Sequence, residues 1–172
     1  MSSERSGDQP GYVVRPAIEA DLEAIVGFEI QIARISFADE AMTDPAFHRK
    51  RVLSAIGRPG EITLVAAPAA VPAPAPAVAP QQVAGWAWMS VRTNSVSGAR
   101  YGNFRSLAVQ DGATEAGELL LTEVIDQAET AGLDELVGKV HARNLNMRTL
   151  YRKFGFDVVH LSMHRRRAGN GS

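Results

Sequence analysis

The sequence contains no cysteine, and this limits the chemistry that its side chains can perform. Thiolate nucleophiles, disulfides and cysteine-based zinc sites are excluded, so any reaction must use hydroxyls, carboxylates, histidines or the backbone. His48, His160 and His164 have no companions at the spacing of metal ligands, so we expect no metal site. The fourth histidine, His141, ends a predicted strand, where it is either a general base or a structural histidine.

The most strongly patterned segment is VHARNLNMRTLYRKFGF, residues 140–156. It predicts a strand end, a helix and a glycine stop, because apolar and aromatic side chains follow the asparagine at helical spacing. Asn144 is suited to cap this helix. From spacing alone, Tyr151 is either a packed residue of an amphipathic face or a phenol available for proton transfer. The positions that form the pattern are Asn144, Met147, Leu150, Tyr151, Gly155 and Phe156.

The elements that must position these residues alternate between strands and helices, which predicts an α/β fold with helices over a mixed sheet. On the strand 81–93, Trp86, Trp88 and Ser90 should face one side, and Ala87, Met89 and Val91 the other. A glycine-containing loop, 110–117, should lead into a helix with an apolar face. Strands are expected at 12–17, 61–67, 81–93, 103–109, 133–142 and 156–165, and helices at 20–35, 43–56, from 117 to about 130, and from 144.

Residues 66–80 differ from the rest of the chain, because they hold five of its nine prolines and otherwise only alanine and valine. Such a segment donates few ladder hydrogen bonds and favours polyproline II, so we expect an exposed loop. It is either a linker or a ligand for a partner that binds proline-rich segments. The expected organisation is a disordered tail (1–10), one domain (11–167) that contains this loop, and a second tail (168–172).

Length and composition indicate one ordinary globular domain, with 172 residues, 45% hydrophobic and 22% charged. The 18 basic and 19 acidic side chains form no basic stripe, so we expect no nucleic-acid partner. Apolar runs such as 62–67 are far shorter than the ~20 residues of a membrane span, so no membrane partner is expected. The polar start MSSERSGDQP lacks the apolar core of a signal peptide, which predicts a cytoplasmic protein.

The pattern of residues 140–156 resembles the last conserved block of the GCN5-related N-acetyltransferase (GNAT) superfamily, with Met147 in place of the usual small residue. SLAV and the helix GELLLTEVIDQAETAGL resemble the family's acyl-CoA block, and YVVRPAIEADLEAIV resembles its opening strand and helix. The likeness covers most of the chain. It implies a mixed, mostly antiparallel central sheet flanked by helices, with a splayed pair of parallel strands, here 103–109 and 134–141.

The resemblance also implies an enzyme, a transferase that moves an acetyl group from acetyl-CoA to a primary amine. With no cysteine to carry the acetyl group, the amine should attack directly in a ternary complex. The Val109 amide would polarise the thioester carbonyl, and Tyr151 would protonate the departing thiolate. The positions that match the family's acetyl-CoA contacts are Leu107, Ala108, Val109, Gly112, Ala116, Gly117, Asn144, Met147 and Tyr151.

The loop 110–117 departs from the family pattern: it is about two residues short, and Asp111, Glu115 and Glu118 stand where a basic approach to the phosphates is usual. At roughly 6 Å and an effective dielectric of about 40, one carboxylate repels one phosphate charge by ~1.4 kcal/mol before salt screening. An alternative reading is therefore a degenerate member of the fold that binds or interacts without productive acetyl-CoA binding.

The general base and the acceptor site are less clearly marked. Candidate bases are His141, Asp39, Glu40 and a water chain. The acceptor wall implied by the resemblance includes Phe37, Asp39 and Glu40, and an acidic rim that adds Glu29 and Asp44 would favour a cationic amine. The expected partner is a small-molecule or peptide amine, and a homodimer is left open.

Overall fold

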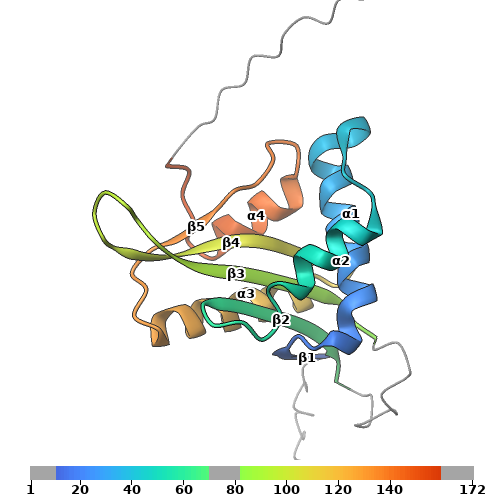
Figure 1. Ribbon diagram of the computed structural model, residues 1–172, viewed down its shortest axis with the longest axis horizontal. Coiled ribbons are helices and arrows are strands. Elements are labelled where there is room, and N and C mark those ends of the chain that lie inside the picture. The colour runs from blue at the N-terminus through green and yellow to red at the C-terminus, as the bar shows by residue number, and fades with distance from the viewer. Residues whose placement is uncertain (1–10, 70–81, 160–172) are drawn as a thin grey trace, which may run out of the picture.

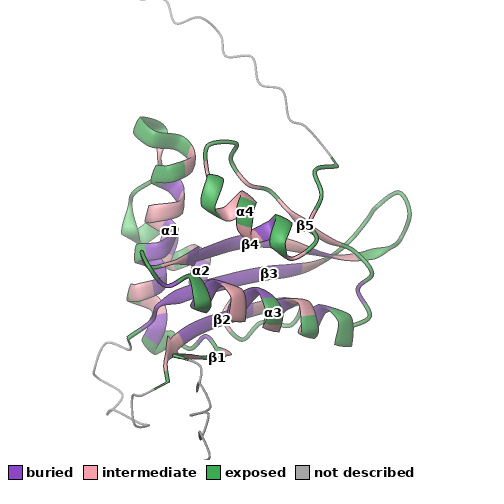
Figure 2. Ribbon diagram, turned by 180° about the vertical axis from the view of Figure 1, so that it is seen from behind, coloured by how far each residue is buried: buried purple, intermediate pink, exposed green. Residues whose placement is uncertain are grey.

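The computed structural model describes residues 11–69 and 82–159, which form a central sheet with helices on both faces (Figure 1). Helices α1 and α2 cover one face, and α3 and α4 pack on the other, as the view from behind shows (Figure 2). The helices are α1 (Leu22–Phe37), α2 (Pro45–Leu53), α3 (Thr114–Thr130) and α4 (Leu145–Lys153), with 3₁₀ turns η1 (Glu19–Asp21) and η2 (Ala38–Glu40).

The sheet has five described strands in the order β1-β2-β3-β4-β5. Neighbouring strands are antiparallel except for β4 and β5, which are parallel. The expected mixed, mostly antiparallel α/β fold with one parallel pair is confirmed. The strands are β1 (Tyr12–Pro16), β2 (Glu61–Pro68), β3 (Gly85–Thr93), β4 (Arg100–Val109) and β5 (Leu136–Gly138).

The two faces of β3 separate two hydrophobic cores, as its alternating sequence predicts. Trp86 and Trp88 belong to the core beneath α1 and α2. Ala87 and Met89 belong to the core beneath α3 and α4. A register shift between Trp88 and Met89 shows a β-bulge, in which β4 has one extra residue, Arg105, opposite β3.

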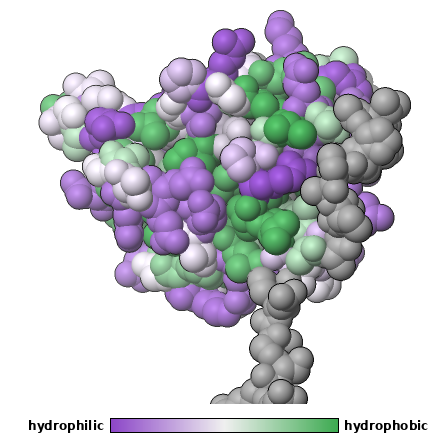
Figure 3. Space-filling view, turned by 90° about the horizontal axis from the view of Figure 1, so that it is seen from below, coloured by the Kyte–Doolittle hydropathy of each residue, from purple (hydrophilic) through white to green (hydrophobic). Residues whose placement is uncertain are grey.

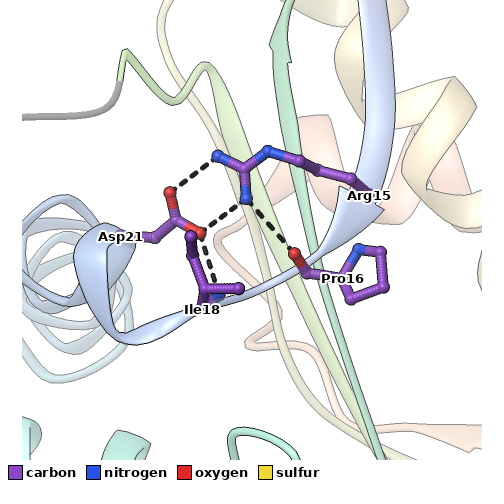
Figure 4. A network of polar contacts seen from close by, with 4 residues as sticks. All are labelled: Arg15, Pro16, Ile18 and Asp21. Carbon is purple, nitrogen blue, oxygen red and sulfur yellow. Dashed lines mark hydrogen bonds and ion pairs between the residues drawn. The ribbon is translucent and has the colours of Figure 1, made fainter. Parts of the chain in front are cut away.

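The junction of β1 with α1 is fixed by an ion pair between the half-buried Arg15 and the buried Asp21 (Figure 4). Asp21 is fully buried and accepts two hydrogen bonds from the guanidinium of Arg15, at 2.7 and 2.8 Å, and one from the Ile18 amide at 3.0 Å. Both carboxylate oxygens therefore have partners, which a buried charge requires. The junction orients α1 over the sheet.

The sequence predicts that Asp44 caps α2 and that Pro45 stands at its first position, and both predictions are confirmed. The Asp44 side chain accepts from the Ala46 amide at 2.9 Å, and Pro45 occupies the first turn. Apolar spacing predicts Phe47, Val52, Leu53 and Ile56 on its inward face, and this prediction is wrong for two of them. Phe47 and Leu53 are exposed, at 49% and 36%, although Val52 is buried. The buried face instead follows His48, Val52 and Ala55, because these i, i+4 and i+7 positions point together toward the sheet.

Several expected boundaries are also corrected. The loop 110–117 ends early, since α3 begins at Thr114, and the strand expected at 133–142 is ladder-paired only over Leu136–Gly138. Residues 66–68 of the expected loop extend β2, where Ala66 is fully buried and pairs with Gly85. Residues 156–159 are not strand, and the rest of that expected strand, like residues 70–80 and the two tails, lies outside the described residues.

The surface of the fold mixes polar and apolar side chains. Seen from below, apolar groups gather near the middle of the face, with polar groups around them (Figure 3). No described helix is long and apolar enough to cross a membrane.

Candidate functional site

The parallel strands β4 and β5 separate after a short paired stretch. Their ladder joins Gly102 to Leu136, Asn103 to Val137 and Phe104 to Gly138. Beyond Phe104, β4 continues to Val109, and residues 106–109 still pair with β3 but no longer with β5. The edge of β4 that faces β5 is therefore open from residue 105 onward.

The direction of the open amides follows from the alternation of the strand. The Gln110 amide donates to the Ala84 carbonyl at 2.8 Å, so it points toward the β3 side. Because alternate residues of a strand present their N–H and C=O groups to opposite sides, Ala108 also faces β3. Leu107 and Val109 therefore present their backbone groups to the open side, where β5 has left the ladder.

The hydroxyl of Tyr151 lies where the strands part. A Cβ atom placed on Gly138 would lie 3.2 Å from the Tyr151 oxygen and 3.1 Å from its Cζ atom. The ring also contacts Phe104 and Phe156, with centroid distances of 5.8 and 4.9 Å. The absence of a side chain at Gly138 allows the phenol to approach the last paired residue of β5.

Burial raises the pKa of the Tyr151 phenol well above its usual value of 10.0, because the phenolate would lose its hydration. Tyr151 is 8% exposed. The side chain therefore stays protonated at neutral pH and can act as a proton donor. It also fills part of the core beneath α3 and α4, as a packed residue of an amphipathic face would, and its part in proton transfer stays a prediction.

Asn144 and Met147 lie at the start of α4. The Asn144 side chain accepts from the Met147 amide at 3.1 Å, so Asn144 is the helix cap that the sequence predicts. Met147 is half-buried and packs against the α3 side of the core, as Leu150 does. Their predicted contacts with acetyl-CoA stay predictions.

The first turn of α3 and the tight turn before it hold the remaining predicted cofactor residues, Gly112, Ala116 and Gly117. Gly112 adopts a positive φ of 81°, which suits glycine in this tight turn. Ala116 and Gly117 are buried in the first helical turn, not in a loop. Gly117 packs closely, since an added Cβ would lie 3.3 Å from the Val109 side chain.

Two carboxylates are fixed around this turn. The Glu115 side chain accepts from the Gly11 amide at 3.2 Å, and Glu118 pairs with Lys153 of α4 at 2.5 Å. Lys153 is the basic residue that sequence reasoning missed. Its place in the last turn of α4 gave no sign that it would reach α3. It neutralises one of the carboxylates that the sequence placed against the phosphates.

A second region brings together residues far apart in the sequence. A cavity of about 290 Å³ lies between the end of α1 with η2 and the connection from β5 to α4. The predicted acceptor residues Phe37, Asp39 and Glu40 line it, and so does the predicted base His141. Arg143 also lines it and was missed by sequence reasoning, because residues before a helix cap have no periodicity that shows their direction.

The His141 ring has a defined partner. Its Nδ1 atom accepts from the Arg143 backbone amide at 3.2 Å. In the neutral ring this leaves the proton on Nε2, so neither nitrogen offers a free lone pair in this arrangement. Asp39 and Glu40 are exposed on η2. The role of a general base therefore stays a prediction for each of the three.

The expected acidic rim is smaller than the sequence predicts. Glu29 is buried, accepts from Trp86 Nε1 at 2.8 Å and pairs with Arg51, so it is neutralised inside the core. Asp44 caps α2. Among the described residues, no group of three His, Asp or Glu side chains is arranged to hold a metal ion.

The fold is shared with solved acetyltransferases. No family model matches the sequence, and no curated protein matches it. The aminoglycoside 6'-N-acetyltransferase AAC(6')-Ih from Acinetobacter baumannii is 15% identical, with a TM-score of 0.64 over 92% of this chain and 100% of that one. An acetyltransferase from Trypanosoma brucei is 16% identical, with a TM-score of 0.63 over 91% and 99%.

A transcriptional regulator from Bacillus halodurans is also similar, at 13% identity and a TM-score of 0.68 over 91% of this chain and 99% of that one. A protein described as a regulator, not as an acetyltransferase, is therefore also similar in structure. At these identities the likeness concerns the fold, and the parallel pair β4 and β5 with its helices agrees with it: the chain has the fold of the GCN5-related N-acetyltransferases.

Proposed function

We propose that this protein is an acyl-CoA-dependent N-acyltransferase that moves an acetyl group from acetyl-CoA to a primary amine by direct attack in a ternary complex. The observation that carries the proposal is the open edge of β4. It combines the outward backbone groups of Leu107 and Val109 with the protonated phenol of Tyr151 at the point where β5 departs.

The open strand edge fits an extended, amide-containing arm such as pantetheine. An extended chain can bond to a free strand edge as an additional strand does, with one donor and one acceptor at alternate positions. Leu107 and Val109 offer such groups. At the end of this edge, the Val109 amide can donate to a thioester oxygen as negative charge develops on it.

Tyr151 then acts as the proton donor. The amine nitrogen forms a bond to the carbonyl carbon, and the bond from that carbon to sulfur breaks. Tyr151 gives its proton to the departing thiolate, whose basicity rises as the bond breaks. The proton released by the amine restores the phenol, through water or a side chain of the 290 Å³ cavity. Atoms and charge balance, with an amide and a free thiol as products.

Acetyl-CoA binding is the first experiment. The full chain is titrated with acetyl-CoA and CoA in a thermal-shift assay, with release of free thiol measured against a panel of amines. Ligand at 100 times its dissociation constant should add about 2.7 kcal/mol of stability. No shift with either ligand, together with no thiol release, would contradict the proposal.

The second candidate function is a binding module of the same fold without productive acetyl-CoA binding. The observation that favours it is the Glu115 carboxylate, held by Gly11 in the first turn of α3. This is the end of the helix whose partial positive charge would otherwise attract phosphate. Binding of neither acetyl-CoA nor CoA would favour this function over catalysis.

A further inference from the structure

The 290 Å³ cavity carries charges of both signs on opposite walls. One wall is the end of α1 with η2, which contributes Asp39 and Glu40. The other wall is the connection between β5 and α4, which contributes His141 and Arg143. Figure 1 shows these two segments side by side at the top of the molecule. An occupant of this cavity would lie between acidic and basic groups.

The basic wall is held by a dense set of hydrogen bonds. The Asn144 amide donates to the His141 carbonyl at 2.9 Å, and the Arg143 amide donates to His141 Nδ1 at 3.2 Å. The Arg148 guanidinium donates to the Ala142 carbonyl at 3.0 Å. These bonds fix the backbone of the connection, so the Arg143 side chain begins from a defined position. A fixed backbone lowers the conformational entropy that Arg143 loses when an anion binds.

The acidic wall begins at an unusual backbone position. Ala38 adopts φ 47° and ψ −117°, and among the described residues it is the only one other than glycine with positive φ. Such a conformation is strained in a residue with a Cβ atom. It ends α1 abruptly and turns η2, with Asp39, toward the opposite wall. The Ala41 amide closes this turn on the Ala38 carbonyl at 3.1 Å.

We propose that this cavity selects a small zwitterionic acceptor, an amine that also carries a carboxylate, such as a free amino acid or a short peptide. The inference rests on the proposed function and names its substrate class. Arg143 pairs with the carboxylate, which its planar guanidinium can bind through two hydrogen bonds. Asp39 attracts the ammonium group. The volume is close to the lower limit of about 300 Å³ for ligand pockets, which suits a compact acceptor.

The two charged walls distinguish this acceptor class from a polycation. An acceptor with several ammonium groups would be repelled by Arg143, which offsets its attraction to Asp39. An acceptor with only carboxylates would be attracted by Arg143 but repelled by Asp39. Since Glu29 and Asp44 are occupied within the fold, they add no acidic charge to counter the basic wall.

The test compares acceptors that differ only in the carboxylate. Each free amino acid is assayed beside the amine that remains when its carboxylate is removed, for example L-lysine beside 1,5-diaminopentane, with acetyl-CoA and the full chain. The expected kcat/KM is at least ~10-fold higher for the best amino acid than for its decarboxylated partner. In Arg143→Gln this ratio should fall to about 1–2, because the amide carries no charge.

The matched control is Arg152→Gln, which removes an exposed arginine of α4 outside the cavity and should leave the ratio unchanged. Asp39→Asn should lower kcat/KM for acceptors that carry an ammonium group. In the wild type, the contribution of the carboxylate and that of the ammonium group to kcat/KM should both decrease as salt rises. Equal kcat/KM for the two members of every pair, or a ratio that Arg143→Gln does not change, would overturn the inference.

Failure of the proposed function can be recognised separately. If acetyl-CoA produces no thermal shift and no amine is acetylated, catalysis is contradicted, and calorimetric binding of the same amino acids and amines decides the inference. Binding of an amino acid that Arg143→Gln abolishes and Arg152→Gln retains would support the cavity. Absence of binding to the wild-type chain would reject it.

Discussion

The open end of β4 and the first turn of α3 are neighbours in the chain, but they offer opposite chemistry to an acyl-CoA. At the strand end, Leu107 and Val109 present backbone groups, and Tyr151 holds a proton beside Gly138. At the helix start, Glu115 holds a carboxylate at the position that the proposed function assigns to phosphate. Under the proposed function, groups for chemistry and groups for affinity are therefore separable, so each can be altered without the other.

Removing the Tyr151 hydroxyl should have the largest effect. Tyr151→Phe keeps the packing against Phe104 and Phe156 but loses the proton donor. We expect kcat to fall by ~10²–10⁴ with little change in acetyl-CoA affinity. Steady-state kinetics and thermal-shift titration measure the two quantities. An unchanged kcat would remove Tyr151 from the chemistry and leave it a packing residue.

A methyl group on Gly138 should disturb the position of the same hydroxyl. In Gly138→Ala the new Cβ would lie 3.1–3.3 Å from three atoms of the Tyr151 ring and hydroxyl, so the ring must move by a few tenths of an ångström. We expect kcat to fall by about 3- to 30-fold and stability by about 1 kcal/mol.

The control for this change is Gly27→Ala, because an added Cβ at Gly27 has nothing within 4 Å. It should leave kcat unchanged. In a Tyr151→Phe background, Gly138→Ala should cause little further loss of kcat, since the displaced group is already absent. Additive losses in the double variant would show that Gly138 acts through another residue.

Neutralising Glu115 tests the other region of the comparison, the first turn of α3. Glu115→Gln keeps an oxygen for the Gly11 amide but removes the charge at the start of α3. We expect the dissociation constant of acetyl-CoA to decrease by about 3- to 10-fold at low salt, with less effect at high salt and no change in kcat. Glu129→Gln, in the last turn of the same helix, is the matched control. An equal effect of both substitutions would contradict a local phosphate interaction.

The raised pKa of Tyr151 gives the smallest effect, which appears only in alkali. A tyrosine in the unfolded chain ionises near pH 10, whereas the folded state holds this phenol neutral to higher pH. The stabilisation is therefore complete below about pH 10 and is lost as pH rises above it, by up to about 1.4 kcal/mol per pH unit.

Urea unfolding of the wild type and Tyr151→Phe between pH 8 and 11 isolates this contribution, because the other alkaline groups are common to both. The free energy of unfolding of the wild type should decrease more steeply above pH 10. Parallel curves would show that the phenol ionises equally in the folded and unfolded states.

The sequence predicted the elements that carry a local signal. Asp44 and Asn144 were recognised as caps because a cap bonds to an amide two or three residues away. The facing of Trp86 and Trp88 followed from strand alternation alone. The parallel pair β4 and β5 came from the family resemblance, whose pattern extends over both strands and α4.

Features that depend on distant contacts could not be predicted. Glu29 looked like a rim carboxylate, but it is buried because Trp86 and Arg51 approach it from other elements. Lys153 reaches Glu118 across two helices, and Arg143 faces η2 across the cavity. No periodicity in one segment encodes such meetings, since they are set by how the helices lie on the sheet.

The β-bulge at Arg105 determines that Leu107 and Val109, and not their neighbours, face the opening. Strand alternation assigns odd and even residues to opposite sides, and the Gly102 amide, which donates to Glu135, sets the even residues toward β5. Arg105 is an extra residue outside this count, so the parity changes and the odd residues face the opening beyond it. A chain shortened by Arg105 alone would keep every later residue on its present side. A residue removed between 106 and 108, with the bulge retained, would turn the amides after it to the other side, so that Val109 faces away from the opening. The same loss of one residue would thus be neutral or disabling according to its position relative to the bulge.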